Sequence, residues 1–150
     1  MSVRDESSRR SPLIELNRLI KDNRVSEYSS PNLALGMRPV VFGAGTAQWV
    51  WEQPPPNTLN PFGTVQGGYV AILIDEMFST AIASVLEAAE WAMTVEFKVN
   101  FLRALNPKPL HGEARVLRRT RFIAFLEAQI TDQSGAVAVT ASSTWAIAQR

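Results

Sequence analysis

The feature that most constrains the fold is a long apolar stretch in the middle of the chain, residues 69–86. It is almost long enough to span a bilayer, but Asp75 and Glu76 lie near its centre. Inserting the aspartate alone into lipid would cost about 2.5–3.5 kcal/mol. We therefore predict the core helix of a soluble protein, from about Gly68 to Glu87, with no membrane span. A helix that is apolar on almost every side must be enclosed by other elements.

The segment before this helix has the composition of a strand. Residues 38–52 are rich in valine and aromatic side chains, and Gly43 and Gly45 interrupt them. We predict one long strand there, with a bulge at the glycines. The prolines at positions 54–56 then end the pairing.

Everything after the helix has the pattern of strands. From Thr94 onward apolar and polar residues alternate, which is the period of a half-buried strand. Further strands are predicted at about 110–118, 122–132 and 136–147, and their tight connections make them neighbouring hairpins.

These elements predict an α+β fold in which one curved antiparallel sheet wraps around the long central helix. The later strands carry apolar residues on both faces, because Ile123 and Phe125 alternate with Ala124 and Leu126. The outer face of the sheet therefore also needs a cover, and we predict a partner subunit.

The chain of 150 residues is long enough for one domain. Residues 1–30 are predicted to be a disordered head followed by a short amphipathic helix that begins at Ser11-Pro12. Residues 31–150 form the single folded domain.

Composition excludes several function classes. Fifteen basic and fourteen acidic side chains nearly cancel, so we expect no nucleic-acid partner. There is no cysteine and only one histidine, so we expect neither a thiolate nucleophile nor a metal site. A catalytic role is not expected for His111, which lies far from the motif described next. The charged N-terminus lacks the apolar core of a secretory signal, and the expected location is cytoplasmic.

A spaced set of polar and glycine residues surrounds the start of the helix. It consists of Asn60, Gly63, Gln66, Gly67, Gly68 and Asp75, followed by the strand T-V-E-F-K-V-N-F. This pattern resembles the hotdog-fold acyl-CoA thioesterases, in particular the phenylacetate-pathway and 4-hydroxybenzoyl-CoA branch, over residues 38–148. The resemblance implies hydrolysis of an acyl-CoA thioester, with coenzyme A as part of the substrate and no other cofactor. It also implies a homo-oligomer, either a dimer or a dimer of dimers.

The resemblance assigns roles to individual residues. Asp75 takes the place of the nucleophile or general base, Gly67 and Gly68 lie at the helix entry, and Asn60 and Thr94 match positions that orient the attacking water. The alternatives are a structural acid at Asp75, a turn-forming Asn60 and an ordinary strand residue at Thr94. Glu76 is a rival base, but neighbouring helical side chains point about 100° apart, so we expect that both acids do not face one site.

The chemistry fits these residue types independently of the resemblance. Unpaired N–H groups at a helix N-terminus stabilise an oxyanion, and glycine at 67 and 68 lets a carbonyl approach the backbone. A carboxylate at the edge of an apolar pocket is a competent base.

Gln66 departs from the family pattern, which has histidine there. Glutamine does not exchange protons at neutral pH, although its amide still forms hydrogen bonds. This substitution motivates the alternative function of a non-catalytic acyl-CoA or lipid-binding module. A hotdog dehydratase is disfavoured, because those enzymes rely on a catalytic histidine.

The basic side chains concentrate in one short segment, Arg118, Arg119 and Arg121, supplemented by Arg103 and Lys108. Guanidinium groups bind phosphates well, so the three arginines are candidates for holding the phosphates of coenzyme A. A solvated hairpin turn is the alternative.

Overall fold

A computed structural model describes residues 18, 19, 21, 22, 24 and 31–149. The predicted disordered head and short helix in residues 1–30 therefore lie largely outside the described residues. None of the described helices is long and apolar enough to cross a membrane.

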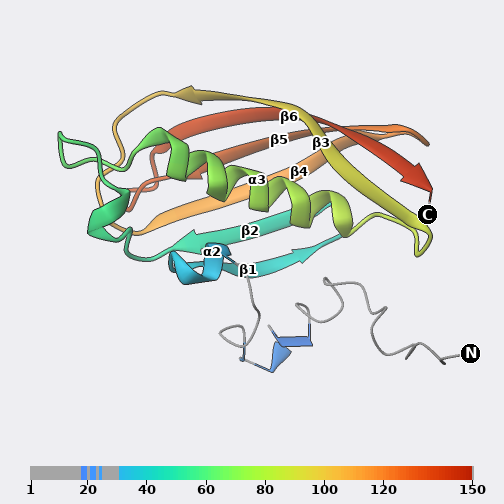
Figure 1. Cartoon of the computed structure of the whole chain (residues 1–150), viewed down its shortest axis with the longest axis horizontal. Coiled ribbons are helices and arrows are strands. Elements are labelled where there is room, and N and C mark those ends of the chain that lie inside the picture. Colours follow the sequence, from blue (N-terminus) through green and yellow to red (C-terminus); the bar gives the residue numbers. More distant parts are fainter. Residues whose placement is uncertain (1–17, 20, 23, 25–30, 150) are drawn as a thin grey trace, which may run out of the picture.

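Six strands form one antiparallel sheet, and the long helix α3 lies against its concave face (Figure 1). The order of the strands across the sheet is β1-β2-β4-β5-β6-β3, so β1 and β3 are the edge strands. This arrangement confirms the predicted curved sheet around a central helix. The elements in chain order are α2 (Pro31–Ala34), β1 (Met37–Gly43), β2 (Thr46–Trp51), η3 (Pro56–Thr58), α3 (Gly67–Ala83), β3 (Glu90–Phe101), β4 (Leu110–Arg119), β5 (Ile123–Thr131) and β6 (Val137–Gln149).

The predicted long strand over residues 38–52 is wrong, because the chain reverses in its middle. β1 and β2 pair with each other as an antiparallel hairpin. The turn between them has positive φ at three successive residues, Gly43 (154°), Ala44 (53°) and Gly45 (82°). Glycine adopts these angles at little cost, so the two glycines mark a reversal and not a bulge.

The core forms where the apolar side of α3 meets the sheet. Leu73, Ile74, Met77 and Phe78 are fully buried. The helix approaches β4 closely at Gly112, where an added Cβ would collide with the sulfur of Met77. Any larger residue at position 112 would force the Met77 side chain to move, so the glycine allows the close approach of α3 to β4.

The boundaries around the end of α3 differ from the prediction. The helix ends at Ala83 and not near Glu87, and β3 begins at Glu90 and not at Thr94. The first residues of β3 are held by pairing with the end of β6, from Glu90 with Gln149 onward. The sequence there does not alternate, so only the tertiary partner shows that it is a strand. The predicted hairpins β4–β5 and β5–β6 are confirmed.

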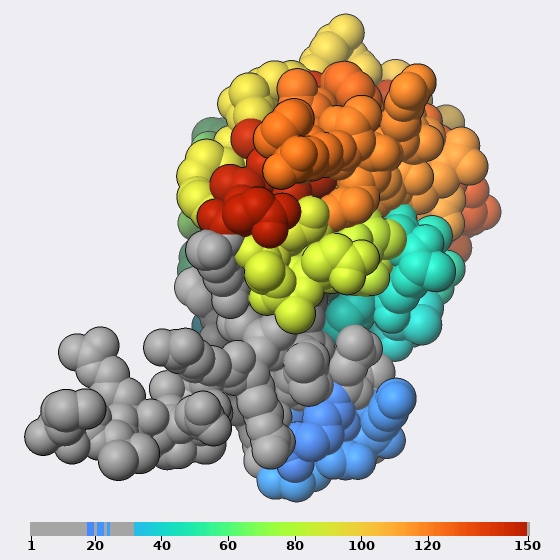
Figure 2. All heavy atoms as spheres, turned by 90° about the vertical axis from the view of Figure 1, so that its right-hand side faces the viewer, coloured from blue at the N-terminus to red at the C-terminus, as the bar shows by residue number. Residues whose placement is uncertain are grey.

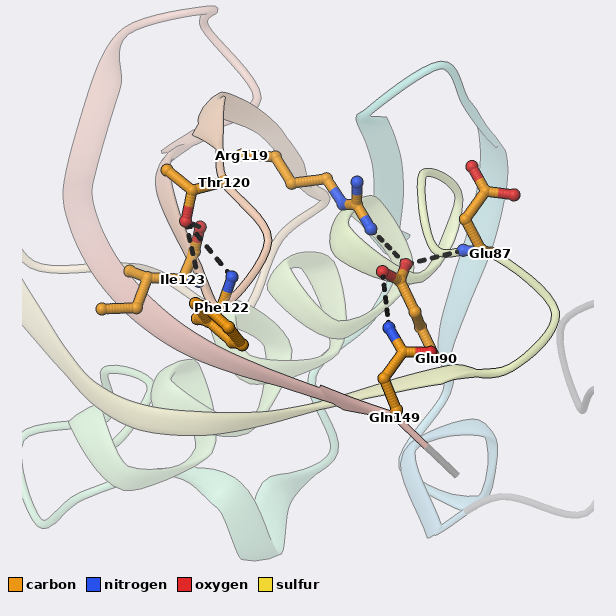
Figure 3. A network of polar contacts seen from close by, with 7 residues as sticks. All are labelled: Glu87, Glu90, Arg119, Thr120, Phe122, Ile123 and Gln149. Carbon is orange, nitrogen blue, oxygen red and sulfur yellow. Dashed lines mark hydrogen bonds and ion pairs between the residues drawn. The ribbon is translucent and has the colours of Figure 1, made fainter.

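The buried carboxylate of Glu90, beyond the end of α3, is the centre of a network of polar contacts (Figure 3). The Glu90 carboxylate accepts hydrogen bonds from the Glu87 backbone N–H at 2.9 Å and from the Gln149 amide at 3.4 Å. It also forms an ion pair with Arg119. The Glu87 N–H, followed by Arg119, keeps the pKa of Glu90 below its ordinary value. The network joins β3, β4 and β6, although β3 and β4 are not neighbours in the sheet.

Candidate active site

A groove of about 440 Å³ runs over the side of α3 that the sheet leaves open. α3 contributes Gly68, Ala71, Ile72 and the two acids, which recur at helical spacing on one side. Strand β3 and helix α2 form the two flanks. The lining residues are Asn32, Gly68, Ala71, Ile72, Asp75, Glu76, Thr94 and Phe97.

Asp75 lies in this groove with one carboxylate oxygen held in place. The Thr94 hydroxyl donates to Asp75 Oδ1 at 3.1 Å. Within the described part of the chain the other oxygen, Oδ2, has no hydrogen-bond partner. The structure thus brings three of the predicted site residues, Gly68, Asp75 and Thr94, to one groove and leaves one oxygen of the acid available to a ligand.

Glu76 lines the same groove, so the prediction that both acids do not face one site is wrong. The groove is open along the helix and is wide enough to include side chains about 100° apart. The Asn32 amide donates a hydrogen bond to Glu76 from the α2 side. Burial, reinforced by the charge of Asp75, raises the pKa of Glu76 to about 7. This glutamate therefore changes its charge near neutral pH.

The two glycines at the start of α3 have different surroundings. Gly68 lines the groove, and nothing lies within 4 Å of the place that a Cβ would occupy. A Cβ on Gly67 would lie 3.0 Å from the Phe101 ring. Among the described residues, the N–H groups of both glycines have no acceptor, as is usual in the first turn of a helix. Open space and unpaired donors coincide at Gly68.

Gln66 and Asn60 do not line the groove of their own chain. Gln66 is exposed at the N-cap of α3 and its side chain makes no capping hydrogen bond. The Asn60 side chain accepts from the N–H groups of Phe62 (3.0 Å) and Thr64 (3.2 Å) and donates to the Thr64 hydroxyl at 2.8 Å. It holds the loop before the helix, and the proposed roles of both residues in orienting substrate or water stay predictions.

Asn32 was not predicted from the sequence as a site residue. Its contact with Glu76 spans 44 residues, and no local pattern indicates a contact of that length. Ile72 was detectable in principle, because it lies one helical turn after Gly68, a predicted site residue. Phe97 was not, because regular alternation puts it on the opposite face of the strand from Thr94; the register shift between Thr94 and Glu96 brings both side chains to the groove.

The structure does not bring the three arginines to this groove. They lie on and beside the β4–β5 turn, at the end of the molecule where the β1–β2 turn and the chain after α3 also meet (Figure 2). Arg119 is paired with Glu90, whereas Arg118 and Arg121 are exposed. The Arg121 guanidinium lies 5.2 Å from the centre of the Phe122 ring.

Other candidates are also outside the groove. His111 is exposed on β4, where it pairs with Val50 of β2. Among the described residues, no three His, Asp or Glu side chains are close enough to hold a metal ion. A second hollow of about 550 Å³ lies on the strands β2, β4, β5 and β6, but its acids are engaged: Glu127 pairs with Arg115, and Glu113 accepts from Gln129.

Comparison with known proteins places this site in a family context. The sequence pattern of the thioesterase superfamily matches residues 62–139, more than half of the chain, including the start of α3 and both groove acids. No curated protein sequence matches the chain.

Solved structures share the whole architecture. A phenylacetic acid degradation-related protein from Ralstonia eutropha JMP134 is 25% identical, with a TM-score of 0.74 over 87% of this chain and 98% of that one. A thioesterase from Haemophilus influenzae is 20% identical, with a TM-score of 0.76 over 91% and 90% of the two chains. The E. coli PaaI protein from the phenylacetic acid degradation operon is 18% identical, with a TM-score of 0.74 over 90% and 92%. These likenesses confirm the hotdog fold.

Proposed function

Because this chain belongs to the thioesterase superfamily, we propose that it hydrolyses an acyl-CoA thioester to the free acid and coenzyme A. One observation carries the proposal: Asp75 lies in an open groove with one oxygen oriented by Thr94 and the other available. An oriented carboxylate of this kind can attack the thioester carbonyl or remove a proton from the attacking water.

The second requirement is a set of donors for the negative charge that develops on the carbonyl oxygen. The unpaired N–H groups of Gly67 and Gly68, at the positive end of the helix dipole, are suited to that role. The open space over Gly68 gives a carbonyl access to them.

One chain does not supply both parts to the same carbonyl. Gly68 and Asp75 are about two helical turns apart, or about 10 Å along the axis, whereas both must lie about 3 Å from the reacting group. We therefore propose a homodimer in which Asp75 of one copy faces the start of α3 in the other. Such a shared site also gives Gln66 and Asn60 a place near the substrate, from the opposite chain.

The edge strand β3 is suited to this contact. It lies at one end of the sheet order, so one side of its backbone has no partner strand among the described residues. It also carries exposed apolar side chains, Trp91, Met93, Val95 and Phe101. An unpaired, apolar edge is a template for association.

For the coenzyme, Arg118 and Arg121 are the exposed candidates to bind phosphates. Arg119 is engaged by Glu90, so its proposed part is to hold the turn that presents the other two.

Removing the Asp75 carboxylate tests the proposal. Asp75→Asn keeps the shape of the side chain and the contact with Thr94 but removes the nucleophile or base. We expect thiol release from a panel of short, long and aromatic acyl-CoAs to fall by about 10²–10⁴-fold, while the melting temperature stays close to that of the wild type. Glu113→Gln, on the outer face of the sheet, is the matched control and should keep its activity.

Unchanged turnover in Asp75→Asn would overturn the assignment. The binding-module alternative, motivated by Gln66, predicts a different result: wild-type protein would bind acyl-CoA in calorimetry but release no thiol above background from any acyl-CoA.

A further inference from the structure

The described residues give the groove two acids and no basic side chain. Of the eight described residues that line it, two are acids, Asp75 and Glu76, and none is lysine, arginine or histidine. The rest of the lining that an acyl chain would contact is apolar, namely Ala71, Ile72 and Phe97.

The hydrogen-bond donors on the two flanks of the groove are already used by these acids. The Thr94 hydroxyl donates to Asp75, and the Asn32 amide donates to Glu76. An incoming carboxylate would therefore have to displace one of these bonds to obtain a side-chain donor.

The segment that a second copy would bring to the site adds no charge. Residues 53–74, which include the loop before α3 and its first two turns, contain no Asp, Glu, Lys, Arg or His. Among the described residues of the groove and of this segment, Asp75 and Glu76 are thus the charged side chains.

We propose that the site hydrolyses thioesters of uncharged acyl groups and rejects acyl groups that carry a second carboxylate, with Glu76 as the residue that determines this specificity. This inference rests on the proposed thioesterase function. The physical cause is repulsion between like charges in a partly desolvated groove, where a pair of charges a few ångströms apart interacts far more strongly than in bulk water. The same repulsion favours release of the carboxylate product.

The charge of Glu76 makes the specificity depend on pH. Its pKa is about 7, so the groove gains its second negative charge between about pH 6 and pH 8. Among the described residues that line the groove, the titratable group beside Glu76 is Asp75, on the same helix, while Asn32 on α2 and Thr94 on β3 are neutral. Discrimination against an anionic acyl group should therefore increase with pH.

The test uses two substrates with the same shape and different charge. Glutaryl-CoA ends in a carboxylate, and 5-methylhexanoyl-CoA replaces that carboxylate with an isopropyl group of the same size. Values of kcat/KM are measured for both substrates at pH 6, 7 and 8, with the uncatalysed rate subtracted. For the wild type at pH 8 we expect a preference of about 100-fold for the neutral substrate.

Glu76→Gln is the diagnostic variant, because glutamine still accepts a hydrogen bond from Asn32 but does not ionise. We expect the preference at pH 8 to fall by about tenfold and to be the same at pH 6 and pH 8. Glu113→Gln is the matched control and should keep both the preference of the wild type and its dependence on pH. Circular dichroism shows whether each variant is folded.

The possible outcomes distinguish a failure of the thioesterase function from a failure of the specificity inference. If neither these two substrates nor any member of the acyl-CoA panel is hydrolysed, the proposed function fails. If both are hydrolysed with similar kcat/KM, or if the wild-type preference does not change between pH 6 and pH 8, the specificity inference is overturned while the thioesterase assignment stands. The wild-type pH series decides this even if Glu76→Gln does not fold.

Discussion

Two glutamates, one in the middle of α3 and one at the start of β3, have opposite electrostatic environments. Glu90 follows the helix, is nearly inaccessible to solvent, and receives hydrogen bonds or an ion pair from Glu87, Arg119 and Gln149. Glu76 lies in the groove, is partly buried, and has one donor, Asn32, within the described part of the chain. The pKa of Glu90 is lowered, and that of Glu76 is raised to about 7.

The difference shows that the number of hydrogen-bond donors decides whether the pKa of a buried acid is raised or lowered. Several donors and a cation stabilise the charged form, whereas burial with a single amide and a neighbouring acid destabilises it. Glu90 is therefore suited to hold strands together, and Glu76 to change its charge during function. Perturbed acids in a groove are typical of functional sites.

The largest expected effect comes from breaking the Glu90 network. Arg119→Met removes the cation and leaves the Glu90 carboxylate buried without it, so the melting temperature should fall further than in any groove variant. Arg118→Met, on the same strand but without this ion pair, is the matched control and should have little effect.

The Glu90 network also fixes the dependence of stability on pH. A lowered pKa contributes stability above the ordinary pKa of 4.5, and this contribution is lost as pH falls through the pKa of the folded state. Glu90→Gln should therefore be less stable than the wild type at pH 7, with the difference shrinking below about pH 4. A constant difference across the acid range would show that the charge of Glu90 does not contribute to stability.

Alanine substitutions at the two glycines at the start of α3 should have smaller and different effects on stability. Gly68→Ala places its methyl group in open space, so the fold should be unaffected or stabilised by up to about 1 kcal/mol from better helix propensity. The methyl group would occupy the approach to the backbone N–H groups, and kcat/KM should fall by about 10²-fold.

Gly67→Ala is the comparison for Gly68→Ala, because its methyl group would press on the Phe101 ring and should lower stability as well as activity. Full activity in Gly68→Ala would remove the helix N-terminus from the proposed mechanism.

Features that depend on neighbouring residues in the sequence could be predicted, whereas contacts between residues far apart in the chain could not. Alternation and apolar runs are local patterns, so α3 and the strands after it were predictable. Of the residues that the motif singled out on the helix, Gly68 and Asp75 line the groove, and their catalytic roles stay predictions. The β1–β2 turn was misjudged because Gly43 and Gly45 suit both a bulge and a reversal. Asn32 and Arg119 act through partners far away in the chain, and nothing in their own surroundings in the sequence indicated those contacts.

The smallest expected effect is the change in stability when Glu76 loses its charge. It is also the most specific test of the comparison, because stability should depend on pH in the opposite direction at Glu76 and at Glu90. A raised pKa means that the folded state holds its proton more tightly than the unfolded state, so stability falls as pH rises from about 4.5 to about 7. Glu76→Gln removes this loss and should be more stable than the wild type at pH 8, by about 1 kcal/mol once solvent screening is allowed for, and equal to it near pH 4. Urea denaturation at both pH values measures the difference. A loss of stability at pH 8 would show that ionised Glu76 stabilises the fold as Glu90 does, and the contrast between the two acids would not hold.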